Sequence, residues 1–266
     1  MIKVGFIGAG NMGSALARAV CRARGTAVYI CDKDTEKRDA VACAIGARAS
    51  DISTIAKECD FVFFAVKPNV IAAVAEELCT SLKEDRRITF VTMAAGVTIE
   101  QLEKKITVGT PAIIRIMPNT PVEIGKGMII YCKNTNVSKD TESCFLDIMK
   151  SAGKLDCVQE SLIDAGTAIS GCGPAYVYMF IEALADGGVA CGLPRDKALI
   201  LAAETLIGAA SMIKEGKGHP EELKDAVCSP GGSTIAGVHA LEEGAFRATA
   251  SNAVISAYKK TLELGK

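Results

Sequence analysis

The residues best suited to chemistry near the N-terminus form a glycine loop, Gly8-Ala9-Gly10-Asn11-Met12-Gly13, between an apolar run and a helical period. Glycines at this spacing allow a tight turn, close approach of the backbone to a pyrophosphate, and close helix packing. The helix N-terminus adds free amides and a favourable dipole for the phosphates. The spacing alone is weak evidence, but in this context it predicts a dinucleotide site rather than a glycine turn without a ligand.

An acidic residue, Asp32, ends the next predicted strand, where a carboxylate accepts hydrogen bonds from the adenosine ribose. Asp32 therefore slightly favours NADH. In the opposite direction, Lys33, Lys37 and Arg38 could together hold the 2′-phosphate of NADPH. Asp34 could cap the following helix. These residues leave the choice between NADH and NADPH open.

Three further segments follow predicted strands or precede predicted helices. Ala65-Val66-Lys67-Pro68 falls at the carboxyl edge of the sheet, where Lys67 either meets a phosphate or ribose or is simply solvated. The second segment is Met117-Pro118-Asn119-Thr120-Pro121. The third contains Pro230-Gly231-Gly232 directly before a helical period, so the amides of Gly232, Ser233 and Thr234 should point outward and suit a carboxylate. A plain Ser or Thr N-cap is the alternative.

The elements that position these segments differ between two parts of the chain. Residues 1–159 alternate short β-branched or aromatic runs with helical periods, which is typical of a parallel sheet covered by helices. The predicted strands are Ile2–Ile7, Ala27–Cys31, Phe61–Val66, Ile88–Thr92, Ile113–Met117, Met128–Tyr131 and Lys154–Val158, and the predicted helices include Met12–Arg24, Val70–Leu82, Thr98–Lys104 and Lys139–Ser151.

Residues 160–266 form the second predicted domain, which is almost wholly helical in pattern and divided by Gly/Pro clusters. The segment Ala198–Ile213 is apolar on more faces than a small bundle can cover. Either a second subunit covers it, or it is a central helix buried within the monomer.

Composition excludes several classes of protein. The 266 residues are 49% hydrophobic and 23% charged with a net charge of −1, which is ordinary for a globular chain and disfavours nucleic-acid partners. The 11 cysteines lack C-x-x-C pairs and there are only 2 histidines, so no metal site is predicted and most cysteines should be reduced core residues.

No targeting or membrane segment is predicted. Met1 leads directly into a strand rather than a signal peptide. The most apolar later stretch, Ala175–Val189, carries Glu182 and Asp186 and is too short to span a bilayer. We therefore expect a cytoplasmic protein without a membrane partner.

Five segments, taken in order, resemble the motifs of the pyrroline-5-carboxylate reductase family and cover nearly the whole chain. The last, continuing through Ile235–Val238 to Leu241-Glu242, is far more specific than the nucleotide loop. The segments are Phe6–Gly13, Ala65–Pro68, Met117–Pro121, Ser170–Tyr176 and Ser229–Thr234.

The resemblance implies an α/β fold with an N-terminal Rossmann-type, doubly wound parallel sheet and an all-helical C-terminal dimerisation domain, in a homodimer that assembles further. It implies hydride transfer from NADPH or NADH to the C=N bond of 1-pyrroline-5-carboxylate, giving L-proline in the last step of proline biosynthesis. Gly232, Ser233, Thr234 and Glu160 would bind substrate, with Thr234 the catalytic residue. Together with Asp32, which is predicted above from its place at a strand end, the cofactor residues would be Ile7, Gly8, Ala9, Gly10, Asn11, Met12, Gly13, Ala65, Val66, Lys67, Pro68, Met93, Ala94, Ala95 and Asn119.

The residue types suit this chemistry, because a protonated imine already accepts hydride strongly and the protein need only fix geometry and stabilise charge. We expect the Thr234 hydroxyl to hydrogen-bond the ring nitrogen. Two residues depart from the usual family pattern: Cys172 stands where serine is common, and Asp32 replaces a small polar residue.

Two rival functions remain to be weighed. A β-hydroxyacid dehydrogenase would need a lysine after the Gly171–Gly173 segment, and the following residues Pro174–Phe180 contain none. A dinucleotide-sensing or proline-homeostasis binding protein would keep Gly8–Gly13 without turnover. The presence of Ser233 and Thr234 argues against that second rival.

Overall fold

The computed structural model describes residues 1–82 and 86–264. Packing divides the chain into two compact units. The sheet unit comprises Met1–Cys172 with the chain from Ala257 onward, and the helical unit comprises Gly173–Ser256. The boundary predicted after residue 159 coincides with the start of a helix that packs with the sheet unit, and it stays a prediction. Gly265 and Lys266 of the predicted second domain lie outside the described residues.

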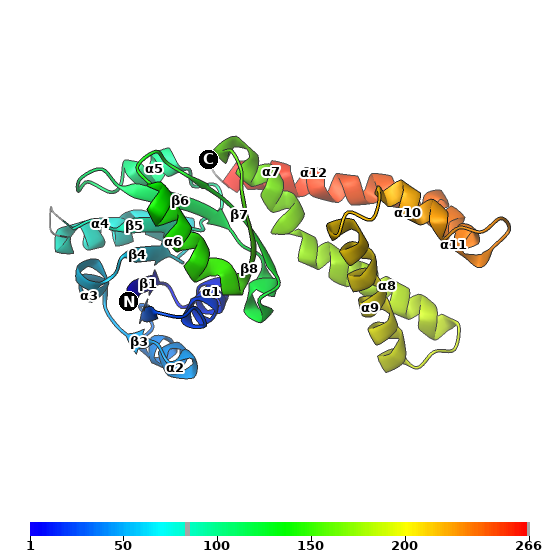
Figure 1. The fold of residues 1–266 in the computed structure, drawn as a ribbon, viewed down its shortest axis with the longest axis horizontal. Coiled ribbons are helices and arrows are strands. Elements are labelled where there is room, and N and C mark those ends of the chain that lie inside the picture. Colours follow the sequence, from blue (N-terminus) through cyan, green and yellow to red (C-terminus); the bar gives the residue numbers. More distant parts are fainter. Residues whose placement is uncertain (83–85, 265–266) are drawn as a thin grey trace. The chain divides into compact units, whose positions relative to one another are not determined.

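The sheet unit is built on a sheet of eight strands over the described residues, in the order β3-β2-β1-β4-β5-β6-β7-β8 (Figure 1). Neighbouring strands from β3 to β6 run parallel, which confirms the Rossmann-type fold. The strands are β1 Ile2–Ile7, β2 Thr26–Cys31, β3 Arg48–Ala49, β4 Phe61–Phe64, β5 Thr89–Thr92, β6 Ala112–Met117, β7 Gly127–Lys133 and β8 Gly153–Cys157.

One strand departs from the predicted parallel sheet. β7 runs antiparallel to β6, with Met117 opposite Ile130. The reason is the connection between them, residues 118–126, which is too short for the crossover that a parallel pair requires. β8 then pairs parallel with β7 after a full helical crossover.

Helices cover both faces of this sheet, and each face has its own apolar cluster. Helices α1 Asn11–Cys21, α2 Thr35–Ile45 and α6 Lys139–Met149 contribute to one cluster, around the stacked rings of Phe6 and Phe63. The other cluster, around Phe64 and Phe90, includes α3 Ile52–Glu58, α4 Ile71–Ser81, α5 Ile99–Glu103 and α7 Glu160–Ser170. Short 3-10 helices lie at η1 Pro68–Val70, η2 Thr120–Ile124 and η3 Lys150–Ala152.

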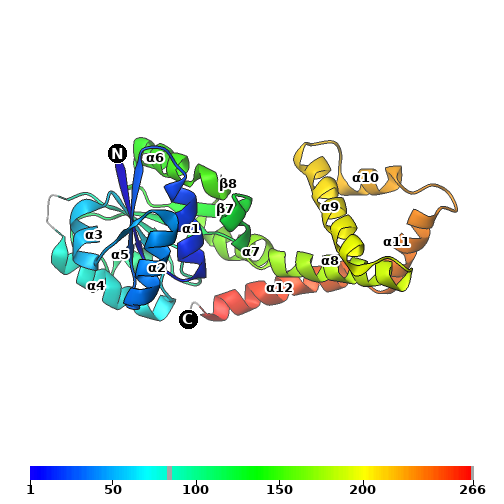
Figure 2. The same ribbon diagram turned by 90° about the horizontal axis from the view of Figure 1, so that it is seen from below.

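The helical unit confirms the change of pattern predicted in the second half of the chain. α8 and α9 form a hairpin (Figure 2). Within it, Gly188 lies close to Ala198 and Leu193. Its elements are α8 Gly173–Ala190, α9 Arg195–Lys214, α10 Pro220–Ala226, α11 Ser233–Glu243 and most of α12 Phe246–Leu264.

Helix α9 is not a helix buried within the monomer. Along it, only Ala198 and Ala202 are buried, whereas Ile200, Leu201 and Ile207 are 58%, 55% and 59% exposed. The second of the two predicted explanations, a central monomer helix, is therefore wrong. The apolar face of α9 is open in the single chain.

One apolar stretch, Glu160–Ala190, is long and apolar enough by composition to cross a membrane, and 11% of its most apolar window is buried. A soluble helix whose apolar face is covered by another chain meets the same criterion. The expected absence of a membrane segment stays a prediction.

All eleven cysteines lie in the described part of the chain and are free. The expectation that most of them belong to the core is wrong, because only Cys59, Cys79 and Cys132 are buried and the others are half-buried or exposed. Burial raises the pKa of the Cys59 thiol to about 12. Cysteine has a small side chain that a helix surface also accommodates. The number of cysteines therefore does not predict which of them are buried.

Candidate functional site

The glycine loop has the geometry that a dinucleotide needs. Gly8 has a φ of +112°, and a Cβ there would lie 2.3 Å from the Ala65 carbonyl oxygen. A Cβ at Gly13 would lie 2.4 Å from the Gly8 carbonyl oxygen. At Gly10 a Cβ would meet nothing within 4 Å, so this glycine faces open space. Two glycines are thus required by packing, and the third leaves room for a ligand to approach the backbone.

The first helix begins without a side-chain cap. Its N-cap is Gly10, and the Ser14 hydroxyl turns back to donate to the Ala9 carbonyl at 2.9 Å. In contrast, α2, α3, α5 and α6 are each capped by an Asp, Ser or Thr side chain. The first-turn amides of α1 therefore remain available for a phosphate, and the loop fits the pyrophosphate of a nicotinamide dinucleotide.

The Asp32 carboxylate organises this loop from the end of β2. One oxygen accepts the Ala9 amide at 2.6 Å and the other accepts the Asp34 amide at 3.0 Å. Asp34 caps α2 by accepting the Lys37 amide, as one alternative predicted. Among the described residues, the side chains of Lys33 and Lys37 are exposed and make no ion pair, whereas Arg38 pairs with Asp39 at 2.7 Å. Lys33 and Lys37 therefore remain free to meet a phosphate.

The carboxyl edge of the parallel strands brings most of the predicted cofactor residues together. Ala65–Pro68 directly follows β4, and the Ala65 amide donates to the Ile7 carbonyl at 2.8 Å. Met93–Ala95 directly follows β5. Lys67 is exposed and is the N-cap residue of η1. The strand order grows outward in opposite directions from β1 and β4, and open α/β sheets bind ligands at the carboxyl edge of such a switch point.

Asn119 and Glu160 have structural partners that the sequence did not reveal. The Asn119 side chain donates to the Ser170 carbonyl at 2.9 Å and accepts the Met128 amide at 2.9 Å. Glu160 Oε1 accepts the Ile99 amide at 2.7 Å and an Arg115 Nη1 bond at 3.3 Å. Their predicted ligand contacts stay predictions, and both side chains hold α7 against the sheet.

Sequence reasoning missed Arg115. It interrupts the apolar run Ile113–Met117 on β6, and this break in a buried strand was the available signal. A charged residue in such a strand must find partners, because burying an isolated charge is very costly.

In the helical unit, α11 begins at Ser233 after a tight turn. Gly231 has a φ of +69°, and the Gly232 amide donates to the Ser229 carbonyl at 3.0 Å. The N-cap is Gly232, and no side chain caps the helix. The alternative of a plain Ser or Thr N-cap is therefore wrong. Ser233 and Thr234 are exposed beside free first-turn amides, an arrangement that suits a carboxylate.

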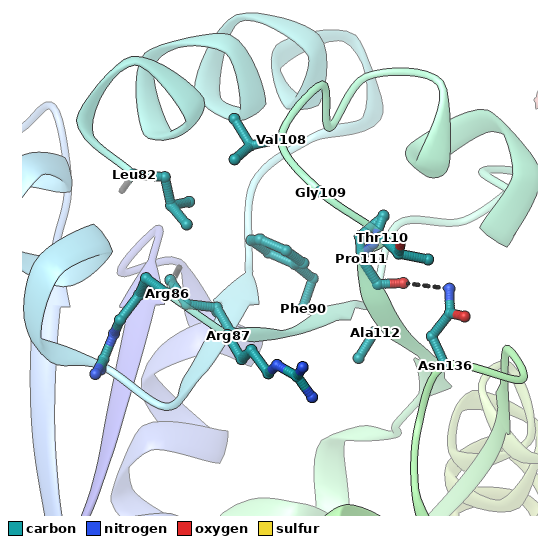
Figure 3. A pocket seen from close by; sticks show the side chains of 11 residues that line it. Leu82, Arg86, Arg87, Phe90, Val108, Gly109, Thr110, Pro111, Ala112 and Asn136 are labelled. Carbon is teal, nitrogen blue, oxygen red and sulfur yellow. Dashed lines mark hydrogen bonds between the residues drawn. The ribbon is translucent and has the colours of Figure 1, made fainter. Parts of the chain in front are cut away.

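A cavity of about 580 Å³ lies elsewhere, at the amino edge where β5 and β6 begin (Figure 3). Arg86 and Arg87 line it, and the Asn136 side chain donates to the Pro111 carbonyl at 3.0 Å. None of the predicted site residues line this cavity. Among the described residues no cluster of histidine, cysteine and carboxylate side chains could hold a metal ion.

Two family models match the chain. Residues 160–264 match pyrroline-5-carboxylate reductase dimerisation, and residues 3–96 match a family described as NADP oxidoreductase, coenzyme F420-dependent. The second match covers the glycine loop and the strands around it. The first covers the helices with exposed apolar faces.

Proteins named pyrroline-5-carboxylate reductase or pyrroline carboxylate reductase match over nearly the whole chain. Pyrroline-5-carboxylate reductase of Arabidopsis thaliana is 41% identical and covers 99% of this chain and 96% of its own. The structure of Plasmodium falciparum pyrroline carboxylate reductase with NADP bound matches with a TM-score of 0.85 and 34% identity, covering 100% of this chain and 98% of that one. The Streptococcus pyogenes enzyme matches with a TM-score of 0.88 and 31% identity over 98% of each chain. This chain belongs to the pyrroline-5-carboxylate reductase family.

Proposed function

We propose that this chain reduces the C=N bond of 1-pyrroline-5-carboxylate with NADH or NADPH and releases L-proline, the last step of proline biosynthesis. The observation that carries the proposal is 41% identity to an enzyme of that name over 99% of the chain. The Rossmann loop alone would suit many dinucleotide enzymes, so the fold by itself does not select the substrate.

The residues at the start of α11 supply what the imine needs. The free first-turn amides of this helix bind the ring carboxylate. The Thr234 hydroxyl accepts a hydrogen bond from the protonated ring nitrogen and so fixes the ring. The bound nicotinamide supplies the hydride to the ring carbon, the electron pair of the C=N bond moves to nitrogen, and nitrogen keeps the proton it already carries.

The test is oxidation of NADH and of NADPH with 1-pyrroline-5-carboxylate as acceptor. We expect turnover by the native chain, a fall in kcat/KM of about a hundredfold in Thr234→Val, and near-normal kcat/KM in Thr234→Ser, which keeps the hydroxyl. Inactivity of the native chain with both cofactors would refute the reaction. Equal kcat/KM in Thr234→Val and the native chain would refute only the role of Thr234.

We further propose that both cofactors are accepted and that Asp32 moves the balance towards NADH. A carboxylate accepts from the ribose hydroxyls and repels a 2′-phosphate, while Lys33 and Lys37 attract that phosphate. Asp32→Ser keeps an acceptor for the Ala9 amide but removes the charge. We expect it to raise the NADPH-to-NADH ratio of kcat/KM about tenfold, and the exposed control Asp140→Ser to leave the ratio unchanged.

For the assembly we propose a homodimer formed through the helical unit, with further association of dimers, in the cytoplasm. The dimerisation family match and the open apolar face of α9 support this. A net charge of −1 offers nothing to recruit nucleic acid or an anionic membrane surface. Light scattering of the purified chain and fractionation of cells test the two statements separately.

A further inference from the structure

Arg115 is the largest fully buried side chain in the described part of the protein, with 1% of its surface exposed. It lies on β6 between Ile114 and Ile116, and among the residues that the structure describes its Nε has no hydrogen-bond partner. A guanidinium stays charged at any physiological pH and cannot escape the cost of burial by losing a proton. Its position is therefore maintained by strong partners.

Those partners are two carboxylates one turn apart on α7. Arg115 Nη2 donates to Asp164 Oδ1 at 2.7 Å, and Nη1 donates to Glu160 Oε1 at 3.3 Å. Residues four apart lie on the same face of a helix, so a single guanidinium fork engages both. The arrangement attaches the first turn of α7 to the carboxyl half of β6.

Glu160 connects this pair to a third element. The same Oε1 accepts the amide of Ile99, the first residue of α5, at 2.7 Å. Residues 93–98 run from the end of β5 to that point, and they begin with the predicted cofactor segment Met93–Ala95. The start of this segment is fixed by β5, where the Thr92 hydroxyl accepts the Ala94 amide at 3.4 Å. Glu160 fixes its other end.

The rest of α7 is also firmly held. The Asn119 side chain donates to the Ser170 carbonyl at the last turn. Gly166 lies so close to β7 that a Cβ there would be 2.5 Å from Ile130 Cδ1. Ile163, between Glu160 and Gly166, is fully buried. The helix is thus a rigid base from which Glu160 acts on the segment after β5.

We propose that Arg115, Glu160 and Asp164 form a positioning clamp that sets the conformation of residues 93–98 and thereby the affinity of the sheet unit for the nicotinamide cofactor. The clamp affects cofactor affinity indirectly, through the backbone of residues 93–98. It acts by keeping the segment after β5 in its binding conformation, so that little ordering remains to be done when the cofactor binds. The inference rests on the proposed function only for the identity of the cofactor.

The experiment measures the Kd of NADH and NADPH in the absence of any imine, followed by kcat and KM for the full reaction. The variants are Glu160→Ala, Glu160→Gln, Arg115→Met and Arg115→Lys. The matched control is Glu100→Ala, one residue beyond Ile99, which removes only an exposed pair with Lys104. Thermal unfolding of each variant is recorded alongside.

We expect Glu160→Ala and Arg115→Met to raise both Kd values about tenfold, because the binding conformation then makes up about a tenth of the population. The cofactor KM should rise with Kd while kcat falls less. Glu160→Gln should restore most of the affinity, because its amide oxygen still accepts from Ile99 and Arg115. Arg115→Lys should be intermediate, since an ammonium lacks the fork that engages two carboxylates.

Native Kd values in Glu160→Ala, with or without reduced thermal stability, would overturn the clamp and leave these residues a purely structural role. The same conclusion follows if Glu160→Gln is as weak as Glu160→Ala. If Arg115→Met does not fold, the pair of Glu160 variants still decides. If the native chain fails to reduce the imine but Glu160→Ala weakens dinucleotide binding, the proposed substrate is wrong and the clamp stands.

Discussion

The sheet unit and the helical unit differ in how completely they bury their apolar side chains. In the sheet unit both faces of the sheet are covered, and Phe6 and Phe63 stack at 4.5 Å with no exposed surface. In the helical unit, all of which is described, the buried apolar residues are only Ala185, Ala198 and Ala202. Its ring pair, Phe180 and Phe246, lies at 5.4 Å with Phe246 41% exposed.

The difference shows that apolar side chains serve two purposes in this protein: they form a core within the chain in one unit and a surface for a second copy in the other. The sheet unit has a complete core and needs no other chain to bury it. The helical unit has small residues inside and long ones outside, as one half of a core that a second copy would complete. Binding of cofactor is therefore expected to depend on the sheet unit alone, and turnover to depend on assembly as well.

The test with the largest expected effect makes the same Ile→Asp substitution once in each unit. Ile200 on α9 and Ile124 on η2 are 58% and 73% exposed. We expect Ile200→Asp to weaken dimer formation by about 2–4 kcal/mol, because it places a charge in an apolar interface. Light scattering should then show monomers, with turnover falling in parallel and Kd for NADPH unchanged. Ile124→Asp should behave as the native chain.

Equal effects of the two Ile→Asp changes would break the comparison, because both units would then rely on contacts outside the chain. Loss of cofactor binding together with the dimer would show that the sheet unit is incomplete by itself.

A second test concerns the glycine loop within the complete unit. Gly10→Ala adds a methyl group to open space at a φ of −67°, which alanine adopts readily. We expect little change in thermal stability but a loss of cofactor affinity of about 1–3 kcal/mol, because the methyl group occupies space that the pyrophosphate needs. Gly13→Ala should instead lower stability, since its Cβ would overlap the Gly8 carbonyl. Calorimetry and thermal unfolding separate the two. Unchanged affinity in Gly10→Ala would place the pyrophosphate elsewhere.

The smallest expected effect belongs to the surface of the helical unit. Arg247 on α12 pairs with Glu221 on α10 at 2.7 Å and with Glu242 on α11 at 2.6 Å. Hydrogen bonds from Arg247 and Lys224 lower the pKa of Glu221 to about 2. A lowered carboxyl pKa contributes stability that is complete above the ordinary value of 4.5 and is lost as pH falls towards 2.

We therefore expect Arg247→Gln to lower Tm slightly at neutral pH, with the difference from the native chain disappearing as pH falls from about 5 to 2. Tm measured across this range provides the check. A difference that stays constant down to pH 2 would show that Arg247 contributes through packing rather than charge.

Local patterns predicted the parts of the fold that local physics determines. The glycine loop, the position of Asp32 directly after β2 and the strands β1, β2, β4, β5 and β6 follow from alternating periods and from the order of strand, loop and helix. The change to an all-helical pattern after residue 160 was equally clear. The start of α11 at Ser233 also followed from the Pro-Gly-Gly turn before it.

Long-range contacts account for what the sequence did not predict. The two-residue strand β3 exists through pairing with β2, and no short pattern marks it. Glu160 was expected at the substrate, but its partners Ile99 and Arg115 lie 61 and 45 residues away in the chain. β7 runs antiparallel to β6 because the connection between them is too short for a crossover. Such relations appear only once the elements are packed.

In the proposed homodimer, the open face of α9 would make the enzyme's output depend on its abundance. If two copies must meet to complete the helical core, mass action makes the working fraction depend on total chain concentration. Below the dissociation constant of the pair, activity would rise roughly as the square of the number of chains made. A modest change in synthesis or degradation would then be amplified in proline output, without any effector or modification of the protein.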